Sequence, residues 1–246
     1  MIVITGASGN TGSVAAESLL AAGEKVRVVG RLAEKLAPIA AKSAEIFVCD
    51  VNNSSDLTRA FDGADAAYVM VPPNLAAENV RQYQLQVAES IATALEQAKV
   101  SHAVLLSSVG AQLSEGAGPV SGLHHVEERL KRVAGLNILS LRAAYFMENL
   151  LLSMKMIQSA GIFAGLNSGD LAMPMIATRD IGERAATELR SRAFSGFQTK
   201  ELLGPRDYTM DEAAKVIGAA IGKPKLSYTK APAFMAKPAL RAAGLS

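Results

Sequence analysis

Residue types that build many functional sites are scarce in this sequence. Its 246 residues include one cysteine, Cys49, three histidines and no tryptophan. A single cysteine excludes an internal disulfide and is typical of proteins from a reducing compartment. The histidines and the cysteine lack the spacing of metal ligands, so we expect no metal site.

The sequence also lacks a charge imbalance and a long apolar run. Its 25 lysines and arginines nearly balance 23 acidic residues, so no global field draws the chain to nucleic acid or to a membrane surface. No apolar run reaches membrane-spanning length, and a strand expected from residue 2 leaves no room for a signal peptide. We therefore expect a cytoplasmic protein, a monomer or homodimer, with no nucleic-acid or membrane partner.

Apolar segments alternate with helical patterns along the first part of the chain. Continuous apolar runs of this kind are typical of parallel strands covered on both faces. Alternating strands and helices predict an α/β fold with a Rossmann-type doubly wound parallel sheet, whose ligands bind at the carboxyl ends of the strands. The first predicted strand begins at residue 2 and ends before the glycine turn, and the others are Lys25–Val29, Ala44–Val48, Ala66–Val71, Val104–Leu106 and Ile138–Leu141.

A glycine-rich turn joins the first predicted strand to the first predicted helix. Three glycines at a spacing of three follow the strand, and an alanine-rich amphipathic run comes next. Residues without a Cβ let backbone N–H groups approach a pyrophosphate, and the helix dipole adds positive charge at the same point. The turn therefore predicts a dinucleotide site formed by Gly6, Ser8, Gly9, Asn10, Thr11 and Gly12.

The end of the second strand indicates which dinucleotide binds. An acidic residue usually stands there in NAD-binding folds, but this chain has Gly30 and Arg31 and no acid between Lys25 and Ala33. A guanidinium binds a 2′-phosphate in bidentate fashion, whereas a carboxylate repels it. We therefore expect NADPH, with NADH as the alternative, and assign the 2′-phosphate to Arg31. Arg27, inside the strand, competes for this role.

Two further strand ends are expected near the cofactor. Asp50 follows the third strand, where its carboxylate either accepts from the adenine amino group or caps the loop before the helix at Ser54–Phe61, and Val51 adjoins it. Val71 and Pro72 end the fourth strand, and a loop at this place usually lies over the cofactor. We include all four residues in the predicted cofactor site.

Four stretches together resemble the NmrA-like branch of atypical short-chain dehydrogenases. They are Gly6-Ala-Ser-Gly9-Asn-Thr-Gly12, the Arg31 position, Ser107-Ser108-Val-Gly-Ala and Arg142-Ala-Ala-Tyr-Phe-Met-Glu-Asn149. The resemblance implies NAD(P)(H) binding. Members of this group include NADPH-dependent quinone and azo-dye reductases, and others bind the dinucleotide as redox sensors. The segment around Ser121-Gly-Leu-His124-His125 looks most like that of bacterial NADPH quinone oxidoreductases.

The usual acid of short-chain dehydrogenases is missing. Those enzymes use a Tyr-x-x-x-Lys pair to protonate an alkoxide, and none of the five tyrosines here has a lysine four residues on. Hydride transfer to a quinone creates a phenolate-like anion with a pKa of about 10, which water or one imidazole protonates. The sequence therefore favours a quinone-like small molecule over a simple ketone as the acceptor.

Three residues are candidates for the chemistry. His124 is predicted to anchor the acceptor or to donate a proton, with His125 as the second choice and a solvent-facing histidine pair as the structural alternative. Ser107, at the end of a central strand, is expected to bond the nicotinamide or the acceptor carbonyl. By the family resemblance, Tyr145 lies near the nicotinamide.

The chain is predicted to form a domain and a smaller lobe. We expect an NAD(P)-binding domain over residues 1–143, to which 177–203 returns, and a smaller substrate lobe formed by 144–176 and 204–246. The predicted function is an NAD(P)H-dependent oxidoreductase acting on quinones. The alternative is a non-catalytic redox sensor that binds a protein partner according to the NADPH/NADP ratio.

Overall fold

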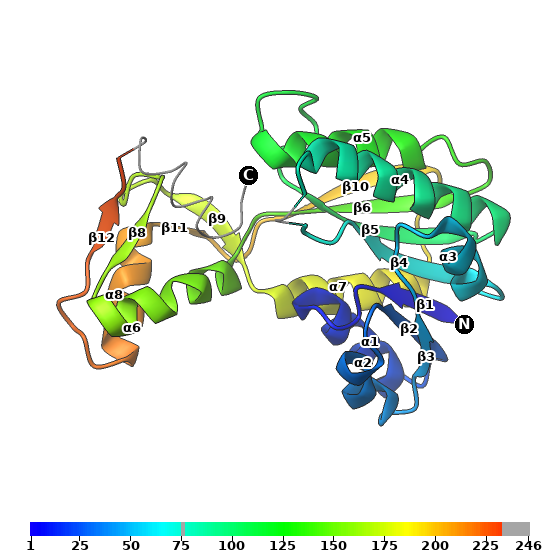
Figure 1. The fold of residues 1–246 in the computed structure, drawn as a ribbon, viewed down its shortest axis with the longest axis horizontal. Helices are drawn as coiled ribbons and strands as arrows, with labels where there is room; N and C mark the ends of the chain where they lie inside the picture. Colours follow the sequence, from blue (N-terminus) through cyan, green and yellow to red (C-terminus); the bar gives the residue numbers. More distant parts are fainter. Residues whose placement is uncertain (75–76, 233–246) are drawn as a thin grey trace. The chain divides into compact units, whose positions relative to one another are not determined.

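The computed structural model describes residues 1–74 and 77–232 (Figure 1). Residues 233–246 of the predicted second lobe lie outside this part of the chain, as do residues 75–76. Within the described part, no helix has both the length and the apolar character needed to span a bilayer.

The chain divides into two compact units. The larger unit is made of Met1–Asn74, Asn79–Ala143 and Thr178–Leu202. The described residues of the smaller unit are 77–78, 144–177 and 203–232.

The larger unit is built on a seven-stranded sheet with the order β10-β6-β5-β4-β1-β2-β3. Every strand pair in it is parallel, so all carboxyl ends lie along one edge. The order reverses between β1 and β4, which is the switch point where open α/β sheets bind ligands. The strands are β1 (Ile2–Thr5), β2 (Val26–Gly30), β3 (Glu45–Val48), β4 (Ala66–Met70), β5 (His102–Ser108), β6 (Asn137–Ala143) and β10 (Phe197–Leu202).

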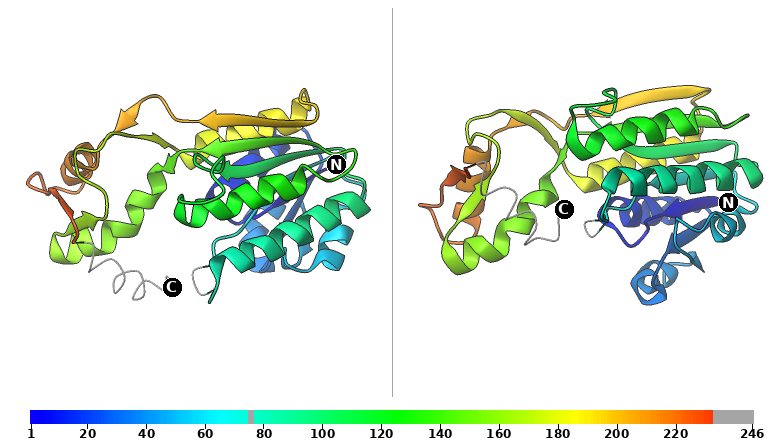
Figure 2. Two further views of the ribbon diagram at one scale, coloured as in Figure 1. Left: turned by 90° about the horizontal axis from the view of Figure 1, so that it is seen from above. Right: turned by 45° about the horizontal axis from the view of Figure 1, so that its top comes forward.

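Helices cover both faces of this sheet, which confirms the predicted α/β fold. One buried cluster joins α3, α4 and α5 to the sheet, and a second joins α1, α2 and α7 to the opposite face (Figure 1). Figure 2 shows α4 and α5 lying side by side along the first face. The helices are α1 (Asn10–Ala21), α2 (Ala33–Ala40), α3 (Ser54–Phe61), α4 (Val80–Gln97), α5 (Ser121–Leu130, after the short η1 at Gly118–Val120) and α7 (Thr178–Ser191).

Helix starts are where the structure differs most from the sequence prediction. The sequence pattern predicts a helix over 76–98; residue 76 lies outside the described part, and α4 begins at Val80, because the side chain of Asn79 accepts from the Gln82 N–H at 2.9 Å and caps the helix there. The sequence pattern also predicts the first helix from Ser13, but α1 begins at Asn10, directly after the glycine turn.

The smaller unit has its own apolar core around Ile157, Phe163, Met175 and Met210. A three-stranded sheet (order β11-β9-β7) and a two-stranded sheet (β12-β8) surround it. The Thr209-x-x-Glu212 spacing predicts a capping box, and the structure has one at the start of α8. The elements are β7 (Tyr145–Phe146), η2 (Met147–Ser153), α6 (Met154–Ala160), β8 (Phe163–Gly165), β9 (Met173–Ile176), β11 (Asp207–Tyr208), α8 (Met210–Ala220) and β12 (Tyr228–Lys230).

Candidate cofactor and active site

The glycine turn after β1 is too tight for side chains at two of its positions. Gly6 has a φ of 61°, and its carbonyl accepts from the Gly9 N–H at 2.9 Å. A Cβ on Gly12 would lie 2.5 Å from the Gly6 oxygen, so only glycine lets α1 start this close to the strand. A Cβ on Gly6 would lie 2.9 Å from the Met70 sulfur at the end of β4. The turn therefore lies at the β1/β4 switch point.

The start of α1 is open to an anion. Gly9 is the N-cap and provides no side-chain acceptor, and the first turn contains no acidic residue. The first N–H groups of a helix have no intrahelical acceptor and carry the positive end of its dipole. Ser8, Gly9 and Asn10 are exposed beside them. The arrangement has the features of a phosphate site.

Thr11 differs from the neighbouring turn residues in how it serves the site. Its side chain is buried, and its hydroxyl oxygen accepts from the Tyr68 phenol at 2.9 Å. The side chain therefore points into the protein, away from the exposed Ser8, Gly9 and Asn10. The side chain instead fastens the start of α1 to β4.

The two arginines that compete for the 2′-phosphate have different surroundings. Arg27 pairs with Glu45 at 2.8 Å and donates to the carbonyls of Ala60 and Asp62, so its guanidinium is fully engaged. Arg31 follows β2, is exposed, and makes no ion pair or hydrogen bond within residues 1–74 and 77–232. Of the two, Arg31 is the one whose guanidinium is available.

Polar side chains lie close together around the loop after β3. The Oδ1 atom of Asp50 accepts from the Asn52 N–H at 2.9 Å, so Asp50 does cap this loop, and the helix cap proper is Asn53. The Asn52 side-chain nitrogen also donates to the same Asp50 oxygen at 3.1 Å, and Tyr83 on α4 lies nearby. Burial first, and then the charge of Asp50, raise the pKa of Tyr83, while nearby Arg31 opposes this.

The helical spacing of α4 predicts a core-facing Tyr83, and its side chain does pack against the core of the larger unit. It also lies near the charges of Arg31 and Asp50, which follow β2 and β3. The adjacent Val51 is buried. Val71 and Pro72 follow the end of β4, and both are half-buried.

Ser107 and Ser108 end β5, as predicted. The Ser107 hydroxyl is buried and donates to the Oε1 atom of Glu127 at 2.6 Å, and Ser108 donates to the Val109 carbonyl. Both hydroxyl protons are thus used inside the protein. Ser107 keeps only acceptor capacity toward a ligand.

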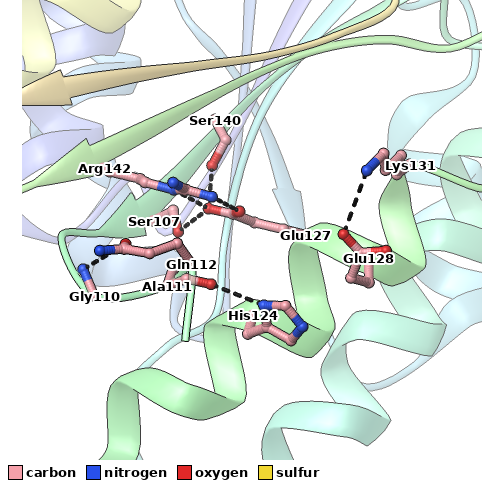
Figure 3. A network of polar contacts seen from close by, with 10 residues as sticks. All are labelled: Ser107, Gly110, Ala111, Gln112, His124, Glu127, Glu128, Lys131, Ser140 and Arg142. Carbon is pink, nitrogen blue, oxygen red and sulfur yellow. Dashed lines mark hydrogen bonds and ion pairs between the residues drawn. The ribbon is translucent and has the colours of Figure 1, made fainter. Parts of the chain in front are cut away.

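A buried carboxylate that the sequence reasoning missed lies behind this strand end (Figure 3). Glu127, on α5, accepts from Ser107, Ser140 and Arg142, and its Oε2 atom lies 2.6 Å from a terminal nitrogen of Arg142. Its side chain is 3% exposed. Burial acts to raise the pKa of Glu127, but the hydrogen bonds from Arg142 and the two serines outweigh it and hold this pKa below its usual range.

A helical pattern could have revealed this carboxylate. Glu127 falls on the apolar stripe of α5 with Leu123, Val126 and Leu130, where an acid needs a buried partner. Its neighbour Glu128 instead pairs with Lys131 at the surface, at 3.4 Å.

The structure separates the two neighbouring histidines. The Nδ1 atom of His124 lies 3.0 Å from the carbonyl oxygen of Ala111, in the segment that follows β5 (Figure 3). A carbonyl only accepts, so Nδ1 carries a proton and Nε2 is left free of this contact. His125 faces α4, where its Nε2 lies 2.6 Å from a terminal nitrogen of Arg81. His124 is therefore the histidine next to the carboxyl edge of the sheet.

Tyr68 is not available as an acid at this edge of the larger unit. Tyr68 is fully buried in β4, and burial raises its pKa far above the usual range. Tyr145 lies in β7 of the smaller unit. Burial first, and then the charge of Tyr228, raise the pKa of Tyr145.

The residues of the larger unit fit a dinucleotide. The turn has no room for side chains at Gly6 and Gly12, the helix start is open to an anion, and the Arg31 guanidinium after β2 has no partner among the described residues. Residues 6–148 match the family of NAD(P)H-binding proteins, a match that covers more than half of the chain. The chain belongs to this NAD(P)H-binding family. Its resemblance to the NmrA-like group is thereby confirmed, and NAD(P)H is its cofactor class.

Two curated proteins are similar to this chain in sequence. One is the (4-alkanoyl-5-oxo-2,5-dihydrofuran-3-yl)methyl phosphate reductase of Streptomyces griseus, 26% identical over 224 residues, which cover 91% of this chain and 75% of that protein. The other is YesF of Bacillus subtilis, described as an uncharacterized oxidoreductase, 28% identical over 225 residues, or 90% and 71% of the two chains.

Two solved structures share the fold of this chain over its whole length. The NADPH-dependent quinone oxidoreductase QOR2 of Escherichia coli, complexed with NADPH, gives a TM-score of 0.83 at 23% identity and is covered over 84%. The triphenylmethane reductase of a Citrobacter species, complexed with NADP(H), gives 0.82 at 20% identity, again with 84% covered.

Proposed function

We propose that this protein is an NADPH-dependent reductase that passes a hydride directly to a quinone or a similarly flat acceptor. One combination carries the proposal: a dinucleotide turn whose neighbouring strand end offers an imidazole but no tyrosine–lysine pair. The names of the similar proteins, which include reductases of a quinone and of a triphenylmethane dye, point the same way.

Arg31 supports the choice of NADPH. A 2′-phosphate gains charge-assisted hydrogen bonds from a guanidinium, and no carboxylate stands between Lys25 and Ala33 to bond the 2′-hydroxyl of NADH. The backbone of Gly6–Gly12 would hold the pyrophosphate. Asp50, through its second oxygen, and Val51 would border the adenine, and Val71 and Pro72 would line the nearby strand end.

His124 supports the choice of acceptor. When bound, NADPH supplies the hydride, and a quinone that accepts it becomes a hydroquinone monoanion that needs one proton. With Nδ1 held by the Ala111 carbonyl, the imidazolium form of His124 donates from Nε2. Ser107, whose hydroxyl proton goes to Glu127, would accept a hydrogen bond from the ligand.

Steady-state oxidation of NADPH and NADH against a panel of quinones and simple ketones tests the proposal. We expect saturable quinone reduction, with kcat/KM higher for NADPH than for NADH by about 10-fold or more. We expect ketones to react at least about 100-fold more slowly, because an alkoxide needs a stronger acid. Tight NADPH binding without turnover of any acceptor would favour the redox-sensing regulator instead.

A further inference from the structure

Two side chains of helix α5 contact the end of β5 and the turn that follows it. His124 bonds the Ala111 carbonyl, and Glu127, three residues later, accepts from the Ser107 hydroxyl. The five-residue segment 107–111 is thus fastened to the same helix at both ends (Figure 3). Its middle is fastened to β6, because the Val109 N–H donates to the Ala143 carbonyl at 3.0 Å.

Arg142 closes this arrangement from the neighbouring strand. It is the register partner of Ser107 in the β5/β6 ladder. Its guanidinium meets Glu127 with two nitrogens, at 3.1 Å to Oε1 and 2.6 Å to Oε2. One carboxylate therefore joins α5, β5 and β6 at the edge where the strands end. A bidentate pair fixes direction as well as distance.

The burial of this pair points to a geometric role. Taking two charges out of water costs much of what their attraction returns, so a buried ion pair is a poor device for stability alone. The ion pair does fix the positions of α5, β5 and β6 relative to one another. Helix α5 carries His124, and β5 leads into the segment whose Ala111 carbonyl holds the imidazole.

We propose that Glu127 and Arg142 are positioning residues that act through the 107–111 segment to hold the His124 imidazole in the Nδ1–H form, with Nε2 left for the acceptor. The catalytic part of this inference rests on the proposed reductase function. The geometric part concerns the chain's own residues and is measured without turnover.

The first test observes the histidine ring by NMR, with ring nitrogens labelled, in the wild type and in Glu127→Gln. The chain has three histidines, so their signals are readily assigned. We expect His124 to be mainly the Nδ1–H tautomer in the wild type and a mixture of both tautomers in Glu127→Gln. Glu128→Gln is the matched control, since it removes the same charge from the next residue of α5, and it should keep the wild-type signal.

The second test is a double-mutant cycle on quinone turnover. Glu127→Gln should lower kcat about 10-fold and change the Kd for NADPH less than about twofold. If Glu127 acts through His124, adding Glu127→Gln to His124→Ala should lower kcat no further, because interacting residues are not additive. Glu128→Gln should leave kcat unchanged.

Ser107→Ala provides a second variant if Glu127→Gln does not fold. It removes one contact of the segment but keeps the ion pair, and it should shift the His124 tautomer in the same direction. The inference is overturned if the variants melt earlier yet keep the wild-type tautomer, since Glu127 would then be only structural. A tautomer shift in a protein that reduces no quinone would uphold the positioning while refuting the proposed function.

Discussion

The Nδ1 atom of His124 lies 3.0 Å from the carbonyl oxygen of Ala111. This contact occupies the Nδ1 atom of His124 and leaves its Nε2 atom for a ligand. In His125 the pattern differs, because its Nε2 is the atom that meets Arg81. The two adjacent histidines therefore lead to different expectations.

His124→Ala should lower kcat for quinone reduction by about 10- to 100-fold, which is modest for the loss of a general acid because water also protonates a hydroquinone anion. The Kd for NADPH, measured by fluorescence titration, should change less than about twofold. His125→Ala is the matched control and should keep the wild-type kcat. Equal losses in the two variants would remove the assigned role of His124.

Arg31→Ala should weaken NADPH binding by about 10- to 100-fold, the usual effect of losing a charge-assisted hydrogen-bond pair. NADH binding should stay within about twofold of the wild type, since NADH has no 2′-phosphate. The NADPH affinity of Arg31→Lys should lie between those of the wild type and Arg31→Ala, because lysine keeps the charge but lacks the planar guanidinium. Isothermal titration with both cofactors measures all of these values, and a parallel loss for NADH would contradict the assignment.

Tyr68→Phe should leave quinone turnover within about twofold of the wild type. The phenol of Tyr68 is buried and donates to Thr11, so it serves the packing of β4 against α1. Loss of this buried hydrogen bond should cost about 1 kcal/mol and lower Tm by about 2–4 °C. A large fall in kcat with an unchanged Tm would instead identify Tyr68 as the missing acid.

The Glu127 carboxylate should make folding stability depend on pH. Its pKa in the folded protein is lowered from an ordinary 4.5, so it adds stability above that value and loses it as the pH falls toward the folded-state pKa. In Glu127→Gln, Tm should therefore fall less steeply between about pH 6 and about pH 3 than in the wild type. Calorimetry measures both slopes, and equal slopes would show that the carboxylate gains nothing from its partners.

Local sequence patterns were sufficient to predict the parallel sheet and the glycine turn. Buried strands and the spacing of Gly6, Gly9 and Gly12 are local features of the sequence. The parallel sheet then brings the glycine turn and the other strand ends to one edge. The choice between Arg27 and Arg31 was not local, because it depends on Glu45 and on carbonyls of another helix. The same holds for Asp50, whose loop contact shows only in the fold.

The Glu127 network was beyond the sequence reasoning for a similar reason. Its four members come from β5, α5 and β6, and only the strand register brings Ser107 beside Arg142. A buried acid on an apolar helix stripe signals that a partner exists without identifying it. The first residue of a helix was also poorly predicted, as the Asn79 cap of α4 shows.

Direct hydride transfer is the central claim, and a single-turnover experiment tests it most directly. The protein, in excess over NADPH, is mixed rapidly with a saturating quinone while the absorbance of the reduced nicotinamide is followed. We predict that this absorbance disappears in one exponential phase, in full, and more slowly in His124→Ala. A stable absorbance in the wild type, with NADPH bound and quinone present, would contradict the reductase account.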